Sequence, residues 1–371
     1  QKVDDTKENR GIDPLPNLDF KFVTANSLVG LPEKDVYGQT DWLQDESGIE
    51  NLRELREEFF NADITERDSI IAKFSMMQRD MALRNSKDSV GDYTKYLTEW
   101  NPFSHGTTPW FESEWMFGVK DGFDIVIGNP PYVQLQKNGG VLARMYEKEG
   151  FQTLARTGDI YTLFYEKGNE LLNTNGHLVY ITSNKWMRAG YGEKLRKYLS
   201  EETTPIVLID LGPDIFETAT VDTNILIFKK GLSDEKCRAC ILKEDFNDEG
   251  FYLNDYVKLN SILLDKFTSD SWLILSPIER SIKEKIEKYG TSLKDWDIQI
   301  NYGIKTGCNE AFIIDGKKKD ELIKQDPKSA EIIRPILRGR DIKRFSYNFA
   351  DLYLINTHNG VEQNGIPPVN I

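Results

Sequence analysis

Residues 123–132, Phe-Asp-Ile-Val-Ile-Gly-Asn-Pro-Pro-Tyr, constrain the fold of this chain more than any other stretch. Four of the first five residues are apolar and three are β-branched, which predicts a short strand buried on both faces. Gly128 ends this strand, and two consecutive prolines cannot continue a hydrogen-bonded ladder. Because proline also restricts the residue before it, Asn129 and Tyr132 are expected on a stiff turn. That turn lies at the carboxyl end of the strand, which is the edge where open parallel sheets bind ligands.

The turn offers acceptors for an amino group. The side-chain oxygen of Asn129 and the carbonyl of Pro130 can each accept one N–H of an amine attached to an aromatic base. Such an amine is a weak nucleophile because its lone pair is delocalised into the ring, and two acceptors aim the lone pair at an electrophile. The ring of Tyr132 gives the base a surface for stacking outside a duplex. A proline-ended core strand followed by tyrosine is the less favoured interpretation.

An apolar strand followed by Asn-Pro-Pro-Tyr resembles the catalytic motif of S-adenosylmethionine-dependent amino-methyltransferases, most of all the adenine-N6 DNA methyltransferases of restriction-modification systems. The resemblance implies direct in-line methyl transfer to a flipped adenine in double-stranded DNA, without a covalent enzyme intermediate. It assigns catalysis to Asn129, Pro130, Pro131 and Tyr132. Methyltransferases that act on protein glutamine or on guanine-N2 of RNA remain alternatives, as does a non-catalytic DNA-recognition module.

The resemblance also implies a cofactor site for S-adenosylmethionine. Residues 20–24 alternate like a short strand, and Asn26 and Ser27 follow at the position where the family contacts the adenine of the cofactor. Phe164 matches an aromatic residue that lines the cofactor pocket. Without the resemblance, Asn-Ser would be an ordinary turn and Phe164 a helix core residue.

The family's glycine-containing cofactor loop, expected before Asn26, is not among these residues, and the sequence does not begin with Met. We therefore expect a piece of a longer methyltransferase, with weak cofactor binding and little or no activity of its own.

The middle of the chain predicts an α/β sheet, and the resemblance implies that it is a Rossmann-like methyltransferase sheet closed by an antiparallel hairpin. A helix is expected from Asp159, as its N-cap, to Asn175–Gly176, followed by a strand over 177–182. A helix over 193–199 and a strand over 206–211 continue the βαβ alternation. Phe216 precedes a final apolar strand, and the resemblance makes it the ring that stacks on the target base opposite Tyr132.

The preceding region is expected to be partly helical and partly irregular. Residues 46–96 predict two helices with a break at 62–65. The aromatic segment 100–117 is expected to pack over a sheet edge, and a lid over a substrate groove is the less favoured alternative. Residues 134–140 predict a polar loop, either near DNA or simply solvated.

The C-terminal part is expected to be a second domain. The sequence predicts a partial methyltransferase domain over 1–231, an irregular connection over 232–275, and the beginning of a second domain over 276–371, which starts with a helix. Residues 300–314 and 333–345 resemble the beginning of a TaqI-like target-recognition domain, a mixed α/β domain. Candidate DNA contacts in this second domain are Arg334, Arg338, Arg340, Lys343 and Arg344.

Composition sets the remaining limits. The 371 residues carry a net charge of −13, which argues against a simple nucleic-acid binder but is compatible with a local basic face. No apolar run is long enough to cross a membrane, and a cytoplasmic protein is expected. Cys237, Cys240 and Cys308 lack a second Cys pair or a nearby histidine, so incidental reduced thiols are favoured over a metal site.

Overall fold

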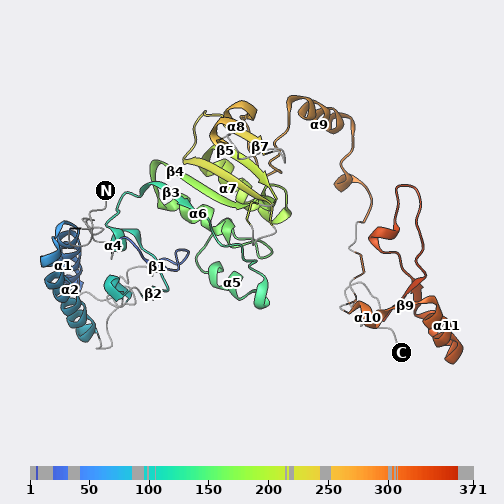
Figure 1. Cartoon of the computed structure of the whole chain (residues 1–371), viewed down its shortest axis with the longest axis horizontal. Helices are drawn as coiled ribbons and strands as arrows, with labels where there is room; N and C mark the ends of the chain where they lie inside the picture. Colours follow the sequence, from blue (N-terminus) through green and yellow to red (C-terminus); the bar gives the residue numbers. More distant parts are fainter. Residues whose placement is uncertain are drawn as a thin grey trace. The chain divides into compact units, whose positions relative to one another are not determined.

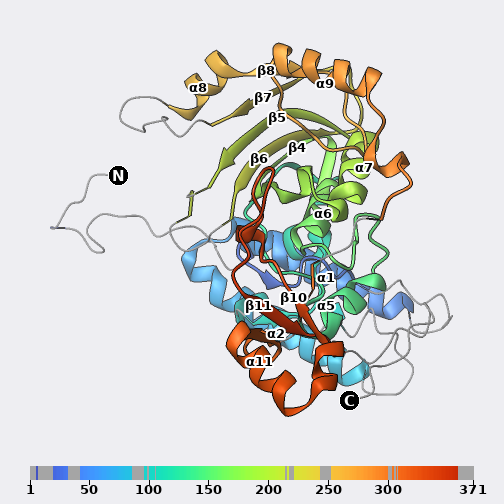
Figure 2. The ribbon, with the colours of Figure 1, turned by 90° about the vertical axis from the view of Figure 1, so that its right-hand side faces the viewer.

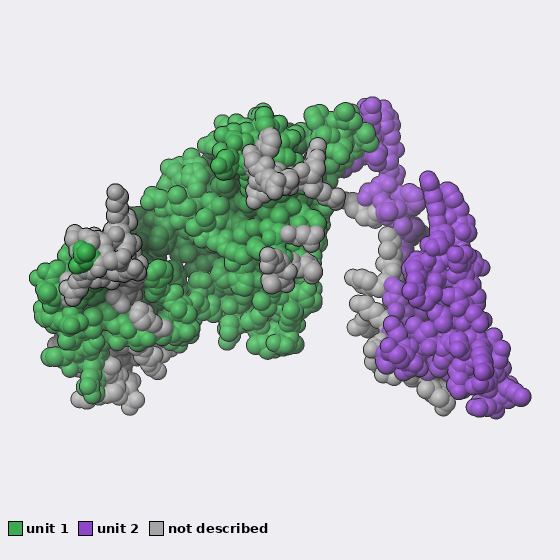
Figure 3. Space-filling view, in the orientation of Figure 1, with its two compact units in different colours: residues 1–283 green, residues 284–371 purple. Residues whose placement is uncertain are grey.

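The structure, a computed structural model, describes the chain in two compact units. The described residues are 6, 20–31, 42–85, 96–97, 100–104, 106–213, 215–216, 221–242, 252–299, 303–304, 306 and 308–357. Unit 1 comprises residues 1–283 and unit 2 residues 284–371 (Figure 3). Each unit is described by itself.

A six-stranded mixed sheet forms the centre of unit 1 (Figure 1). Its order is β3 (Phe123–Gly128), β4 (Leu172–Ser183), β6 (Thr223–Lys230), β5 (Thr203–Gly212), β7 (Cys237–Ile241) and β8 (Ile262–Leu264). Strand β3 is parallel to β4, while β6 lies between β4 and β5 and is antiparallel to both. The expected α/β sheet with an antiparallel hairpin is thus confirmed. The carboxyl ends of β3, β4 and β5 share one edge of the sheet.

Helices α6 (Tyr161–Leu171) and α7 (Glu193–Glu202) cover one face of this sheet. Their apolar side chains form a core with strand residues such as Leu178, Leu208 and Leu226, all completely buried. Helix α8 (Leu253–Asn260) packs on the opposite face against β5 and β7, through Val257.

The prediction that β3 is buried on both faces is wrong. Val126 packs against the core, but Ile125 and Ile127 are 63% and 76% exposed. Alternate side chains of a strand point to opposite faces, and within the described residues only the Val126 face of β3 is covered. In addition, β3 is an edge strand of the sheet.

Other element boundaries also differ from expectation. Helix α6 ends at Leu171, and Asn175 and Gly176 lie inside β4, with Asn175 in the left-handed region at φ 69°. The interval 232–275, expected to be an irregular connection, contributes β7, α8 and β8. The polar loop after Tyr132 leads into α5 (Lys137–Glu147), whose first turn is kinked because three successive residues have positive φ.

A separate apolar cluster precedes β3. Helices α1 (Trp42–Asn61) and α2 (Ile64–Asn85) flank the expected break, and the short strands β1 (Thr24–Ala25) and β2 (Thr107–Thr108) pair in parallel. The strand expected over 20–24 is therefore shorter. The aromatic segment packs on these helices and not over a sheet edge, apart from the Phe117–Phe123 ring contact at 6.2 Å. Helix α4 (Ser113–Phe117) is tied to α1 because buried Arg56 donates to the carbonyls of Glu114 and Trp115.

Unit 2 contains a three-stranded antiparallel sheet in the order β10 (Ile333–Pro335), β11 (Leu352–Ile355), β9 (Ile313–Asp315). Helices α10 (Asn309–Phe312) and α11 (Gly316–Gln325) flank β9, and Figure 2 shows α11 beside the sheet. Helix α9 (Pro277–Tyr289), which was expected from the sequence, carries the chain from unit 1 into unit 2. Among the described helices, none is long and apolar enough to span a membrane.

Candidate active site

The Asn-Pro-Pro-Tyr turn directly follows β3. Pro130 is buried, whereas Asn129 and Pro131 are exposed, so the Asn129 amide is available to a ligand. Gly128 faces the ring of Tyr180, and a Cβ at this glycine would lie 3.2 Å from that ring. The absence of a side chain at residue 128 therefore lets β3 end close against β4.

Tyr132 is anchored at both the turn and the end of β4. Its hydroxyl donates to the side-chain oxygen of Asn129 over 3.0 Å and lies 3.4 Å from the carbonyl of Ile181. Its ring meets the edge of Tyr161 in a T-shaped contact, with centroids 6.1 Å apart. Burial raises the pKa of Tyr132, so the hydroxyl remains a donor at neutral pH.

Phe216 lies opposite Tyr132, before the start of β6. The two ring centroids are 6.5 Å apart and the planes are inclined by 60°. A base stacked between two parallel rings needs about 6.8 Å, twice the 3.4 Å spacing of stacked bases. The observed separation is close to this value, but the two ring planes are inclined, so Phe216 has to rotate before a base could stack on both rings.

A hydrogen-bonded group of polar side chains lies behind Tyr132. The hydroxyls of Tyr161 and Tyr191 are 2.8 Å apart, and Tyr191 donates to the carboxylate of Asp159 over 3.3 Å. Burial raises the pKa of Asp159, while this hydrogen bond and the charges of two lysines oppose the shift.

Asp159 was expected to cap α6, but the N-cap is Ile160, and the Asp159 side chain turns to Tyr191. No sequence pattern signals this pairing, because the partners are separated by 32 residues.

The structure places the expected cofactor residues around a third apolar cluster. The side-chain oxygen of Asn26 accepts from the backbone N–H of Leu28 at 3.3 Å and from the hydroxyl of Tyr146 at 3.5 Å. Leu28 and Tyr146 are buried in this cluster, and half-buried Phe164 packs against it and against the main core. Ser27 is half-buried beside them.

The basic candidates of unit 2 are in different environments. Arg334, Arg340, Lys343 and Arg344 are exposed. Arg338 is half-buried and its guanidinium is bound to Asp341, with Nε and Nη2 each 2.9 Å from a carboxylate oxygen. The structure thus gives Arg338 an intramolecular partner.

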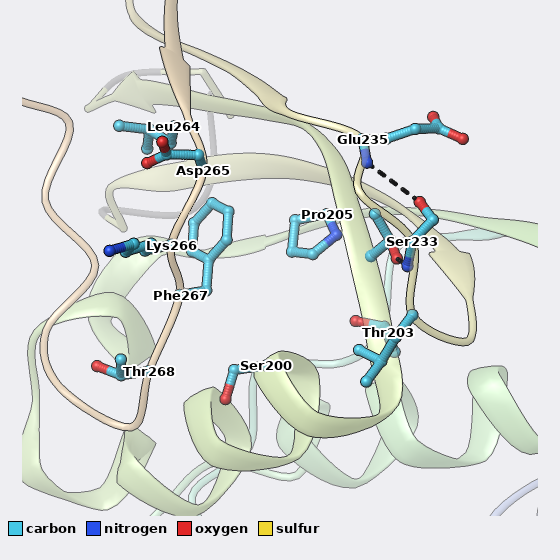
Figure 4. A pocket seen from close by; sticks show the side chains of 12 residues that line it. Ser200, Thr203, Pro205, Ser233, Glu235, Leu264, Asp265, Lys266, Phe267 and Thr268 are labelled. Atoms are coloured by element: carbon cyan, nitrogen blue, oxygen red, sulfur yellow. Dashed lines mark hydrogen bonds between the residues drawn. The ribbon is translucent and has the colours of Figure 1, made fainter.

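The pocket in Figure 4 is not lined by any residue of the Asn-Pro-Pro-Tyr turn. Its volume is about 390 Å³, and it is lined by the first residues of β5 and by the segment after β8. Pro205 and the ring of Phe267 face each other across it, and the hydroxyl of Ser233 accepts from the backbone N–H of Glu235. Strand β5 begins at this pocket, whereas Asn129 follows the carboxyl end of β3, which runs in the same direction as β5. The pocket and Asn129 therefore lie at opposite ends of the strands.

The Cys-x-x-Cys pair lies within β7 and its two thiols face opposite sides of the sheet. Cys237 belongs to the core under α6 and α7, and Cys240 to the cluster under α8. Burial raises the pKa of Cys237 to about 12 and that of Cys240 to about 11. No group of three or more His, Cys, Asp or Glu side chains suited to a metal ion occurs in the part of the chain that the structure describes.

Comparison with known proteins gives a match to one family model. Residues 57–216 match the model described as Eco57I restriction-modification methylase. This range contains the Asn-Pro-Pro-Tyr turn, Asp159, Phe164 and Phe216.

Curated relatives agree with this match. The chain is 24% identical over 259 residues to the type II methyltransferase M.BstVI of Geobacillus stearothermophilus, a match that covers 64% of this chain and 44% of the relative. It is 38% identical over 212 residues to the type II methyltransferase M.XhoI of Xanthomonas vasicola, covering 53% of this chain and 38% of the relative. The chain thus spans less than half the length of these relatives.

Among solved structures, a type IIL restriction-modification enzyme, MmeI in complex with DNA, aligns with a TM-score of 0.37 and 14% identity, over 62% of this chain and 29% of that one. A likeness of this size has no bearing on the function of the chain.

Proposed function

We propose, from the match of residues 57–216 to the family model described as Eco57I restriction-modification methylase, that the chain is the catalytic part of a site-specific adenine-N6 DNA methyltransferase. The observation that carries the proposal is the exposed amide of Asn129, hydrogen-bonded to Tyr132, with Phe216 at a 6.5 Å ring separation. These groups supply an acceptor for a base amine and two rings for the base.

Each of these residues has a distinct role. Tyr132 and Phe216 hold the flipped base, and each stacking contact contributes about 1–3 kcal/mol. The side-chain oxygen of Asn129 and the carbonyl of Pro130 accept the two N–H groups of the base amine. They direct its lone pair at the electrophile and disperse the positive charge that develops on nitrogen. The nitrogen gains a methyl group and then loses one proton to solvent, so no enzyme residue is alkylated.

We further propose S-adenosylmethionine as the methyl donor, which supplies an electrophilic methyl on a sulfonium and leaves as a neutral thioether. The residues expected at the cofactor site fit part of S-adenosylmethionine. The side-chain oxygen of Asn26 already accepts from Leu28 and Tyr146, so Asn26 would donate through its amide N–H groups to a polar ring edge, and Phe164 offers an apolar surface in the neighbouring cluster. Ser27 lies next to Asn26 and is the third candidate.

The test uses the natural full-length protein, labelled S-adenosylmethionine and unmethylated bacterial DNA. Asn129→Ala is expected to lower the rate of methyl transfer by about 100- to 1000-fold, as for loss of a preorganised catalytic hydrogen-bonding group, while DNA binding stays within a few-fold. Asn254→Ala, at an exposed asparagine of α8, is the matched control and should be fully active.

Mass spectrometry of the digested nucleosides identifies the product. N6-methyladenine is expected from the unchanged protein. A methylated cytosine would contradict the adenine assignment, and full activity of Asn129→Ala would contradict the catalytic assignment.

A further inference from the structure

Residues 336–351 of unit 2 form a long hairpin between β10 and β11 (Figure 2). Ile342 and Tyr347 pair in an antiparallel bridge, and the backbone N–H of Lys343 donates to the carbonyl of Ser346 over 2.8 Å. The tip is therefore a tight turn of the four residues 343–346.

The base of this hairpin is fixed by one ion pair. Arg338 contacts both carboxylate oxygens of Asp341 through its side chain, and its backbone N–H donates to the same carboxylate over 2.9 Å. The backbone carbonyl of Asp341 accepts from the N–H of Asn348, which joins the two arms. Asp341 is only 6% exposed, although it lies on a hairpin. Arg338 and Asp341 thus give the tip a defined position relative to β10 and β11.

The tip presents an aromatic side chain to solvent. Phe345 is 90% exposed, the highest value among the large apolar side chains that the structure describes, and Tyr347 is 64% exposed. A single exposed apolar side chain is common on protein surfaces, so the charged residues beside Phe345 decide whether this tip binds a partner.

The charges around Phe345 indicate the chemistry of that partner. Residues 338–345 contain four cationic side chains, and their single carboxylate, Asp341, is already bound to Arg338. The guanidinium of Arg344 lies over the ring of Phe345 at 5.1 Å, and the ammonium of Lys343 donates to the carbonyl of Arg340. In a chain of net charge −13, this is a local positive surface around an exposed ring. Such a combination fits a polyanion that also has flat apolar groups.

We propose that this hairpin binds duplex DNA, with Arg340, Lys343 and Arg344 at the phosphates and Phe345 against the bases as an apolar wedge. The proposal rests on the proposed function, since that function makes DNA the substrate. To the proposed function it adds Phe345 as a residue that contacts bases. Arg338 holds the hairpin in place and does not contact DNA in this proposal.

Fluorescence anisotropy with a fluorescein-labelled duplex, measured over a range of salt concentrations, tests the two parts separately. Replacing Lys343 and Arg344 together by Ala should weaken binding and lower the slope of log affinity against log salt by about 1.8, which is 0.9 for each phosphate that is no longer neutralised. Phe345→Ala should weaken binding by about 5- to 150-fold and leave the salt slope unchanged, because no charge is removed. Phe345→Trp should retain the affinity within a few-fold.

Two control variants match these changes in kind. Replacing Lys324 and Lys328 together by Ala removes the same charge from exposed positions of unit 2 outside the hairpin, and Tyr252→Ala removes an aromatic side chain that is 80% exposed in unit 1. Neither should change the salt slope or the affinity as much as the hairpin variants.

Three results would overturn the proposal. The first is that the unchanged chain does not bind the duplex at low salt. The second is that the hairpin variants bind as tightly as their control variants. The third is that light scattering detects a dimer that Phe345→Ala dissociates. The last would show that the ring packs against a second copy. Methyl transfer by the unchanged protein and by Asn129→Ala is measured separately from duplex binding, so failure of the hairpin assignment can be distinguished from failure of the proposed function.

Discussion

The hydroxyl of Tyr132 donates a hydrogen bond to the side-chain oxygen of Asn129, with 3.0 Å between the two oxygens. The amide oxygen has a second lone pair for a base amine, so the bond orients the amide without consuming its whole acceptor capacity. The same tyrosine reaches the carbonyl of Ile181, so its hydroxyl also links the catalytic turn to β4.

Replacing the Tyr132 hydroxyl and replacing its ring should have different consequences in the full-length protein. Tyr132→Phe removes the bond to Asn129 but keeps the stacking surface, and we expect a loss in kcat below about tenfold. Tyr132→Ala also removes one stacking surface, which should cost a further 5- to 150-fold, or about 1–3 kcal/mol. Steady-state kinetics on DNA measure both effects. Equal losses in the two variants would show that the hydroxyl, and not the ring, is what catalysis needs.

Asp159 should make the protein less stable at neutral pH than an uncharged residue would. Burial raises its pKa, so the stability that it contributes is full below its ordinary pKa of 3.8 and is lost as the pH rises through the raised value. Asp159→Asn should therefore have a Tm at pH 7 equal to or above that of the unchanged protein, and the advantage should shrink near pH 4.

Tyr191→Phe is the complementary variant, because it leaves the Asp159 carboxylate without its hydroxyl donor. It should lose about 1–3 kcal/mol of unfolding free energy in urea. If Asp159→Asn lost as much unfolding free energy at pH 7 as Tyr191→Phe, the ionised carboxylate would be stabilising the fold, which would contradict the prediction for Asp159.

Asp341 should show the opposite pH dependence. The side-chain and backbone hydrogen bonds from Arg338 lower its pKa to about 2. The stability that it contributes is therefore present above 3.8 and is lost as the pH falls toward 2. Asp341→Asn should lower the Tm at pH 7, and the difference from the unchanged protein should narrow as the pH falls below about 4. The exposed Asp297→Asn is the control and should show no such trend. A difference that is constant with pH would exclude the ion pair as its source.

How far the sequence predicted these features depends on the range of the interactions. Local periodicity predicted the break between α1 and α2. It also predicted strands β4, β5 and β6, and the structure contains all of these features. The short strands β7 and β8 were missed because a few residues of mixed composition carry no clear period.

In the candidate site, too, the sequence predicted local features and missed those that depend on distant residues. The spacing of Asn129 and Tyr132 could be read from the turn, whereas the proximity of Phe216 followed only from the family resemblance. The hydrogen bond between Asp159 and Tyr191 depends on two distant segments meeting, which periodicity does not report.

The two faces of β3 differ in exposure, and this difference should appear in stability measurements. Leu178 of β4 pairs with Val126 and is completely buried, so Leu178→Ala should cost about 2–5 kcal/mol, because apolar surface is no longer buried and a cavity remains. Ile127, on the other face, is 76% exposed, and Ile127→Ala should change the unfolding free energy by less than about 0.5 kcal/mol. Urea unfolding followed by circular dichroism measures both. A cost above about 1 kcal/mol for Ile127→Ala would mean that the Ile125–Ile127 face is packed against other protein atoms in solution, since truncating a solvated side chain leaves no cavity.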